Sequence, residues 1–385
     1  MTPSFRVAVV GPSRVGKTTL LTAILSDTRD LLAGTPVTVE MDERTSVRVK
    51  RQQKELQQAL DRGEFDAAAL GGTQEINQYH VTLTGEGDDS AEIPFDLLDY
   101  PGAWLDDEER AKYPHAVSEW PNFLHHVRDS IMLLVPIDAA VLMEAVTPAQ
   151  RAAVSPLLGV IDVNEVGRRW AKGRQMHADE PAVVVLAPLK CEKYFDDNGG
   201  RGHQAGELRA RVRERYDALL KIIAKETAGR STPVRVVYAP IDTYGCVELI
   251  EARWKTVAGR PDFEAHYRFR GRPPKMQVRA AGTVMQELCR SILVGQTQVE
   301  IAARRSHQRD YDAGVERQAE AKGFWETVAY HLSGESLRVN RQIRDQSAAI
   351  TRVAARQAEL LAATRRLAVV PADPRVEVWS GEDWQ

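Results

Sequence analysis

The sequence predicts an α/β fold with three layers, in which helices cover a mostly parallel β-sheet, followed by a C-terminal α-helical extension. The first supporting observation is an apolar run at residues 5–10, which leads through a glycine-containing loop into an amphipathic helix at 18–32. The second is the alternation of further strand-like and helix-like patterns up to about residue 250. The third is the absence of strand patterns between residues 276 and 367, where helical periodicity remains.

Five more strands are expected after the first run. They are short apolar or alternating segments at residues 76–83, 93–98, 130–137, 182–187 and 234–239. The turn sequence Gly85-Glu86-Gly87-Asp88-Asp89 separates the first two, so we expect them to form an antiparallel β-hairpin. Helical patterns separate the others, which predicts parallel pairing. A further helix is expected at 46–60.

We expect a main domain at residues 1–270 with an insertion at 33–70, a helical region at 271–370 that binds an unidentified protein partner, and a tail at 371–385. The chain has 51 Lys and Arg against 54 Asp and Glu, a formal net charge of -3, so no specific nucleic-acid partner is expected. Its three cysteines are scattered, and no stretch has the length of a transmembrane helix. These features predict a cytoplasmic protein and leave membrane association open.

The segment Gly11-Pro12-Ser13-Arg14-Val15-Gly16-Lys17-Thr18 has the spacing of a P-loop between a strand and a helix. Its two glycines allow a tight path in which consecutive N–H groups point at a phosphate, and the next helix adds its positive dipole end. Lys17 is expected to contact the β- and γ-phosphates, and the Thr18 hydroxyl to bind Mg²⁺. The expected phosphate-binding residues are therefore Gly11, Ser13, Arg14, Val15, Gly16, Lys17, Thr18 and Thr19.

A second motif, Asp99-Tyr100-Pro101-Gly102, follows the strand expected at 93–98. A carboxylate at a strand end near the P-loop is suited to bind Mg²⁺ through water, and the N–H of Gly102 is suited to a γ-phosphate. Thr73, in a glycine-containing loop before the hairpin, is expected to complete the Mg²⁺ shell. The alternative interpretation is an ordinary turn and a strand-entry residue. Mg²⁺ is the cofactor that we expect.

The loops after the last two expected strands are predicted to select the base of a bound nucleotide. The Lys190 stem is suited to lie over a purine ring. The Glu192 carboxylate is suited to accept the two N–H donors on the Watson–Crick edge of guanine, which adenine lacks. In Ala239-Pro240-Ile241, a backbone N–H is expected to bind the base oxygen. GTP and GDP are thus the expected ligands, and polar loops without a ligand are the alternative.

These residues resemble a translation-factor-class, Ras-like P-loop GTPase, with five motifs in order: GPSRVGKT, Thr73, DYPG, LKCE and API. GPSRVGKT and DYPGAWLDD are also similar to the YcjX-like family of bacterial GTPases. The resemblance implies a Ras-like fold over about residues 5–250, a bacterial origin, and hydrolysis of GTP to GDP with Mg²⁺. The chain departs from the usual base motif at Leu189 and Glu192, which replace Asn or Thr and Asp. Ala103 stands where small GTPases have a water-positioning Gln.

Arg14 resembles the P-loop arginine of guanylate-binding proteins and atlastins, which acts as an arginine finger in cis. The resemblances imply catalytic roles for Arg14, Lys17 and Thr73. We expect Arg14 to be exposed at rest and to turn inward when two copies meet through their nucleotide faces. The alternative is a surface arginine that balances the acidic run at 106–109. Beside a slow GTPase switch, the sequence leaves open a dimerising dynamin-like or guanylate-binding-like mechanochemical GTPase at a membrane, an ATPase, and a nucleotide-bound scaffold.

Overall fold

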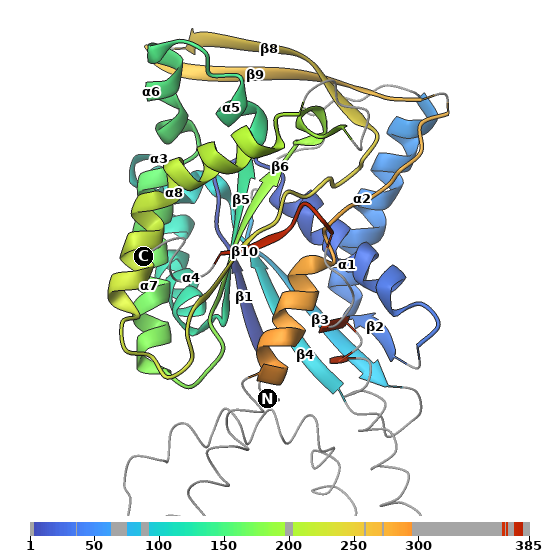
Figure 1. Cartoon of the computed structure of the whole chain (residues 1–385), viewed down its shortest axis with the longest axis vertical. Helices are drawn as coiled ribbons and strands as arrows, with labels where there is room; N and C mark the ends of the chain where they lie inside the picture. Colours follow the sequence, from blue (N-terminus) through green and yellow to red (C-terminus); the bar gives the residue numbers. More distant parts are fainter. Residues whose placement is uncertain are drawn as a thin grey trace, which may run out of the picture.

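Figure 1 shows the computed structural model of the chain, in which a central β-sheet has helices on both sides. The structure describes residues 4–35, 37–62, 75–85, 92–196, 203–257, 259–271, 273–294, 364–365, 367–368 and 373–379. Three predicted features lie wholly or partly outside the described residues. They are Thr73, a part of the insertion expected at 33–70, and most of the helical region expected at 271–370.

Within the described residues, the central sheet has eight strands in the order β10-β7-β6-β5-β1-β4-β3-β2. Five neighbouring strands are parallel: β1 (Phe5–Val9), β4 (Glu92–Asp99), β5 (Met132–Asp138), β6 (Val183–Leu189) and β7 (Arg235–Tyr238). Three strands are antiparallel to their neighbours: β2 (Val37–Met41), β3 (Asn77–Gly85) and β10 (Glu377–Trp379). The antiparallel pair β3–β4 confirms the predicted hairpin.

The parallel strands are apolar because both faces of the sheet are covered. β5 and β6 are buried along their whole length, which is typical of parallel sheets between helices. Successive side chains of β1 enter different layers: Val7 and Val9 join one core cluster, whereas Ala8 joins the other. The sheet therefore separates two hydrophobic cores.

Each core is completed by helices. α1 (Lys17–Leu32), α2 (Glu43–Arg62) and a helix at 283–294 contribute to the first core, whereas α4 (Pro114–Asp129), α7 (Val160–Met176) and α8 (Ala205–Glu226) contribute to the second. The two groups lie on opposite sides of the sheet in Figure 1. This arrangement confirms the α/β class, the mostly parallel sheet and the helix predicted at 46–60.

Shorter elements connect these units. They are η1 (Gly102–Leu105), α3 (Asp107–Ala111), α5 (Ala139–Met143), α6 (Pro148–Leu157) and η2 (Glu192–Tyr194). β8 (Val247–Val257) and β9 (Arg260–Phe269) form a separate two-stranded ribbon, which extends beyond the carboxyl ends of the parallel strands (Figure 1). Trp254 of this ribbon donates a hydrogen bond from Nε1 to the carbonyl oxygen of Glu144, 3.0 Å away. The sequence patterns did not predict this ribbon, β2 or β10.

Two segments from the C-terminal part of the chain pack on the main sheet. The helix at 283–294 places Val284 and Leu288 in the same core cluster as α1, and the N–H of Gly282 donates to Asp27 Oδ2 at 2.6 Å. β10 adds an antiparallel strand beside β7, with Val378 opposite Val237. The tail expected at 371–385 thus contributes a strand to the sheet.

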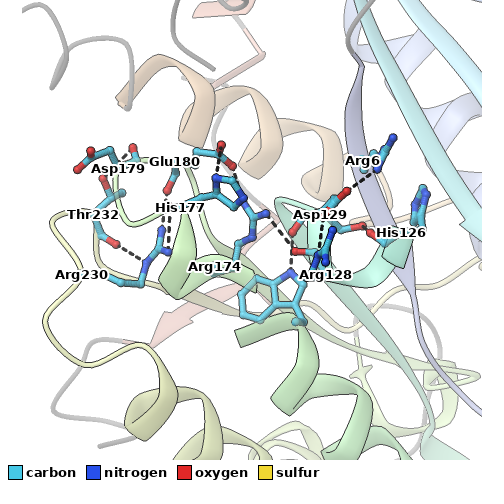
Figure 2. A network of polar contacts seen from close by, with 12 residues as sticks. Arg6, His126, Arg128, Asp129, Arg174, His177, Asp179, Glu180, Arg230 and Thr232 are labelled. Atoms are coloured by element: carbon cyan, nitrogen blue, oxygen red, sulfur yellow. Dashed lines mark hydrogen bonds and ion pairs between the residues drawn. The ribbon is translucent and has the colours of Figure 1, made fainter. Parts of the chain in front are cut away.

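A polar network holds the loops at the amino ends of the parallel strands (Figure 2). The buried Arg174 donates to Glu180 Oε2 at 2.7 Å and to the carbonyl oxygen of Arg128 at 3.2 Å. Arg230 donates to three carbonyl oxygens, those of His177, Glu180 and Thr232. Burial lowers the pKa of Arg230 to about 10, so it stays charged at neutral pH. At this edge of the sheet, the two arginines thus bind carbonyl oxygens of the loops, and Arg174 also forms an ion pair with Glu180.

Candidate nucleotide site at the carboxyl ends of the strands

The predicted site residues lie at the opposite edge, where the parallel strands end. The chain places β4 on one side of β1 and β5 on the other, so the strand order reverses at β1. In open α/β sheets, ligands bind outside the carboxyl ends of the strands at such a reversal. The P-loop follows β1, Asp99 ends β4, and Lys190 follows β6. The fold thus brings together motifs that are far apart in the sequence.

The P-loop backbone has the conformation that its glycines permit. Gly16 has φ 105° and is the N-cap of α1, in a left-handed conformation that a side chain would strain. Because glycine has no side chain, the first N–H groups of α1 have no N-cap acceptor and point toward the loop. Helix N-termini of this kind bind anions. The loop therefore has the geometry for a phosphate.

The Lys17 side chain is folded over this loop. Its ammonium donates to the carbonyl oxygens of Gly11 and Pro12, each 3.0 Å away, and lies 5.4 Å from the centroid of the Tyr100 ring. Only 5% of the residue is exposed, and burial lowers its pKa to about 8, although the Asp99 carboxylate acts in the opposite direction. A buried cation held by backbone oxygens is suited to exchange them for phosphate oxygens, which are stronger acceptors.

Thr18 and Asp99 are adjacent, as the sequence predicts. The Thr18 hydroxyl donates to Asp99 Oδ2 at 2.7 Å, and the Asp99 side chain is completely buried. A hydroxyl and a carboxylate are hard oxygen donors, and Mg²⁺ sites combine one or two such groups with water and phosphate oxygens. The donor set at this position fits Mg²⁺. In the described part of the chain, no group of three or more His, Cys, Asp or Glu side chains could hold a metal ion.

Gly102 lies directly against the P-loop. A Cβ atom at this position would be 2.2 Å from the backbone nitrogen of Ser13 and 2.3 Å from the carbonyl carbon of Pro12. The neighbouring Tyr100 is buried, and its hydroxyl accepts a hydrogen bond from the N–H of Gly11 at 3.3 Å. The DYPG segment therefore contacts the P-loop backbone at two points, and only glycine fits at the closer one.

Arg14 is exposed and has φ 63°, in the left-handed region that non-glycine residues rarely adopt. Lys190 also has a positive φ, 57°, and its ammonium donates to the carbonyl oxygen of Arg14 at 2.9 Å and to Asp138 Oδ2. Strained backbone of this kind concentrates at functional sites. Lys190 thus links the loops after β1, β5 and β6. Sequence reasoning missed Asp138, although it ends a buried strand as Asp99 does.

The other P-loop residues differ in exposure. Ser13 is exposed and Val15 is buried, and the Thr19 hydroxyl accepts a hydrogen bond from Tyr244 at 3.5 Å. The acidic run at 106–109 opens α3, where Asp106 Oδ1 accepts two backbone N–H bonds. No ion pair in the described residues joins that run to Arg14, and Asp107 pairs with Arg110 instead.

The base-binding loop after β6 is more buried than the sequence suggests. Glu192 begins η2 and is 5% exposed. Burial, together with the nearby Asp242 carboxylate, raises the pKa of Glu192 to about 8. The raised pKa favours the protonated acid in the ligand-free protein, whereas the expected recognition of guanine requires a carboxylate.

The loop after β7 does not have the predicted donor. The N–H of Ala239 is bonded to the carbonyl oxygen of Leu186 at 2.9 Å, and that of Ile241 to Pro188 at 2.8 Å. Pro240 has no N–H. The expectation that this segment presents a backbone N–H to a base is therefore corrected. Ala239 and Pro240 still lie at the carboxyl edge, beside the loop that carries Lys190.

Comparison with models of known protein families and with curated protein sequences found no match. Among the described residues, no helix combines the length and the apolar character needed to cross a membrane.

Proposed function

We propose that this chain is a Ras-like, Mg²⁺-dependent P-loop protein that binds GTP and hydrolyses it slowly to GDP. The observation that carries the proposal is the convergence of Lys17, the Thr18–Asp99 pair and Gly102 at the reversal of the strand order. These groups match a triphosphate with its metal ion in charge and chemistry. The antiparallel strand β3 beside an otherwise parallel core also supports the Ras-like order.

The P-loop residues, Asp99 and Thr73 each have a role in this proposal. Lys17 binds phosphate oxygens, and Thr18 and Asp99 hold Mg²⁺, which neutralises charge on the phosphates when bound. Arg14, exposed on the P-loop, approaches the γ-phosphate when a second copy covers the site. Thr73, outside the described residues, completes the metal shell in this proposal.

The switch lies in the DYPG segment. Because Gly102 contacts Ser13 backbone directly, a γ-phosphate on the P-loop changes the surroundings of Gly102. Loops that touch this phosphate or its metal are ordered by it and released on hydrolysis. The GAWL turn of η1 and the acidic helix α3 follow at once, and they carry the change toward a partner.

An ATPase is the second candidate, and a specific observation favours it. A protonated Glu192 both donates and accepts a hydrogen bond, as the Watson–Crick edge of adenine also does. A carboxylate at the same position accepts only, which suits guanine. The protonation state of Glu192 with a ligand bound therefore separates the two candidates.

Competitive binding of GTP, GDP and ATP in the presence of Mg²⁺ tests the proposal. Lys17→Ala is the negative control. The matched variant Lys221→Ala removes an exposed lysine that pairs with Asp217 on α8. We expect preference for guanine nucleotides, loss of binding in Lys17→Ala, and no change in Lys221→Ala. Equal or tighter binding of ATP would replace the GTPase proposal with the ATPase.

A further inference from the structure

Asp242 is a buried carboxylate beside the loops that follow β6 and β7. It follows Ala239-Pro240-Ile241 and is 0% exposed. The thiol of Cys191, from the Lys190–Glu192 loop, donates to Asp242 Oδ1 at 3.3 Å. The electrostatic influence of Asp242 on Glu192 shows that the two acids are neighbours. Asp242 thus joins the loop after β6 to the loop after β7.

The cation that binds this carboxylate comes from the C-terminal segment. Arg375 Nη1 donates to Asp242 Oδ2 at 2.8 Å, although the two residues are separated by 133 positions. The Arg375 side chain is 6% exposed, and its guanidinium lies 4.7 Å from the centroid of the Phe195 ring, just beyond η2. Arg375, in the turn just before β10, therefore touches the segments that follow β6 and β7.

The backbone fixes Asp242 from the other side of the same region. The N–H of Asp242 donates to the carbonyl oxygen of Arg279 at 3.2 Å, and the N–H of Arg279 donates back at 3.0 Å. The segments before and after residues 295–363 thus both contact Asp242. β10 holds Arg375 in place, because Trp379 stacks on Tyr238 of β7 with ring centroids 5.8 Å apart.

We propose that Arg375 is a positioning residue for base recognition, which sets the geometry of the loops that carry Lys190 and Glu192 through Asp242. The inference rests on the proposed nucleotide function. Removal of one partner from a buried ion pair leaves an uncompensated charge, and the structure rearranges to solvate it. The loops after β6 and β7 absorb that rearrangement here, because they supply the contacts of Asp242.

The loops around Asp242 also touch the phosphate end of the site, because Lys190 donates to the Arg14 carbonyl oxygen and Tyr244, two residues after Asp242, donates to the Thr19 hydroxyl. Arg375 and Asp242 themselves contact the loops after β6 and β7 and the C-terminal segments. Loss of the Arg375 charge should therefore weaken the binding of a nucleoside diphosphate by a larger factor than the binding of a phosphate chain without a base. A purely structural defect would weaken both by the same factor.

Binding of GDP and of inorganic tripolyphosphate to the full chain, measured by calorimetry with Mg²⁺, tests the inference. We expect Arg375→Ala to weaken GDP binding by a factor at least about fivefold larger than its effect on tripolyphosphate binding, the lower end of coupling between linked sites. Arg375→Lys, which keeps the charge, should restore part of the loss. Arg209→Ala is the matched control, because it breaks the exposed ion pair between Arg209 of α8 and Glu377 of β10, two residues after Arg375.

The outcomes separate the inference from the proposed function. If Arg375→Ala changes both affinities by the same factor, or neither, Arg375 does not position the base loops. If wild-type protein binds tripolyphosphate as tightly as GDP, the base loops themselves, and with them the proposed function, are refuted. Should Arg375→Ala fail to fold, Asp242→Asn removes the charge of the partner and keeps the shape of its side chain. The change in GDP affinity relative to the change in tripolyphosphate affinity is then measured in Asp242→Asn instead.

Discussion

The closest contact in the candidate site allows a sharp test with one methyl group. In Gly102→Ala, the new Cβ would lie 2.2 Å from the Ser13 nitrogen and 2.3 Å from the Pro12 carbonyl carbon. Ordinary van der Waals contact begins near 3.4 Å. The obstructing atoms are backbone, so no side-chain rotation relieves the clash. Either the P-loop or the DYPG segment must move by about 1 Å.

The size of the effect follows from this displacement. Inserting a methyl group into a packed site costs about 1–3 kcal/mol. If the binding-competent P-loop must be restored at that cost, the Kd for GTP rises about 5- to 150-fold. A misplacement of about 1 Å in a catalytic arrangement lowers the rate by up to about 100-fold. A domain of ordinary stability remains folded after such a loss.

Calorimetric GTP binding, single-turnover hydrolysis and urea unfolding of Gly102→Ala test the argument together. Gly206→Ala is the matched control: Gly206 lies in the first turn of α8, and a Cβ there would meet nothing within 4 Å. The control should bind and hydrolyse GTP as wild type does. Wild-type affinity, rate and stability in Gly102→Ala would refute the close packing of the DYPG segment on the P-loop.

Three further predictions concern charge. The pKa of Glu192 is raised to about 8, and guanine needs the Glu192 carboxylate, so the affinity for GDP should fall about tenfold for each pH unit below that value. Calorimetry at several pH values measures this slope, which should be absent in Glu192→Gln. Burial lowers the pKa of His126 to about 4, so the unfolded state binds more protons below pH 6.5. Urea unfolding should then show about 2 kcal/mol lost between pH 7 and 4.5, and little loss in His126→Gln. Turnover per molecule should rise with protein concentration in wild type, and Arg14→Ala should abolish that rise.

The phosphate end of the site was predictable because its determinants are local. Gly16, Lys17 and Thr18 are consecutive, and the strand before them and the helix after them have strong apolar patterns. Asp99 ends a strand whose hairpin partner was also recognisable. Parallel strands meet at one edge, so the two motifs had to converge there.

The elements that were missed lack such patterns. β10 has three residues, too few for a periodicity, and owes its conformation to pairing with β7. In the β8–β9 ribbon, most of β8 is exposed and most of β9 is only half-buried, so the ribbon has no continuous buried face that an apolar pattern could reveal. Tertiary contacts decide strand formation in both cases, because β-propensity depends strongly on context.

The base end of the site shows the same limit in its chemistry. The sequence identifies Glu192 from its place after a strand, but its protonation depends on Asp242, which lies 50 positions further on, and on burial. Burial and the Asp242 charge therefore favour the protonated acid over the carboxylate that was expected to accept hydrogen bonds. The shift opposes guanine binding until the ligand's donors favour the charged form.

Arg375, from the C-terminal segment, also affects the pKa of Glu192. Its charge lowers the pKa of Glu192, as that of Arg270 does, while burial and Asp242 raise it. The C-terminal segment therefore influences both the position of the base-binding loop and the protonation of its acid. A P-loop contacts the phosphates of a nucleotide and not its base, so it does not by itself distinguish guanine from adenine. Under the proposed function, a partner that displaces β10 would disturb the contact of Arg375 with Asp242 across 133 positions, and we expect it to alter nucleotide preference.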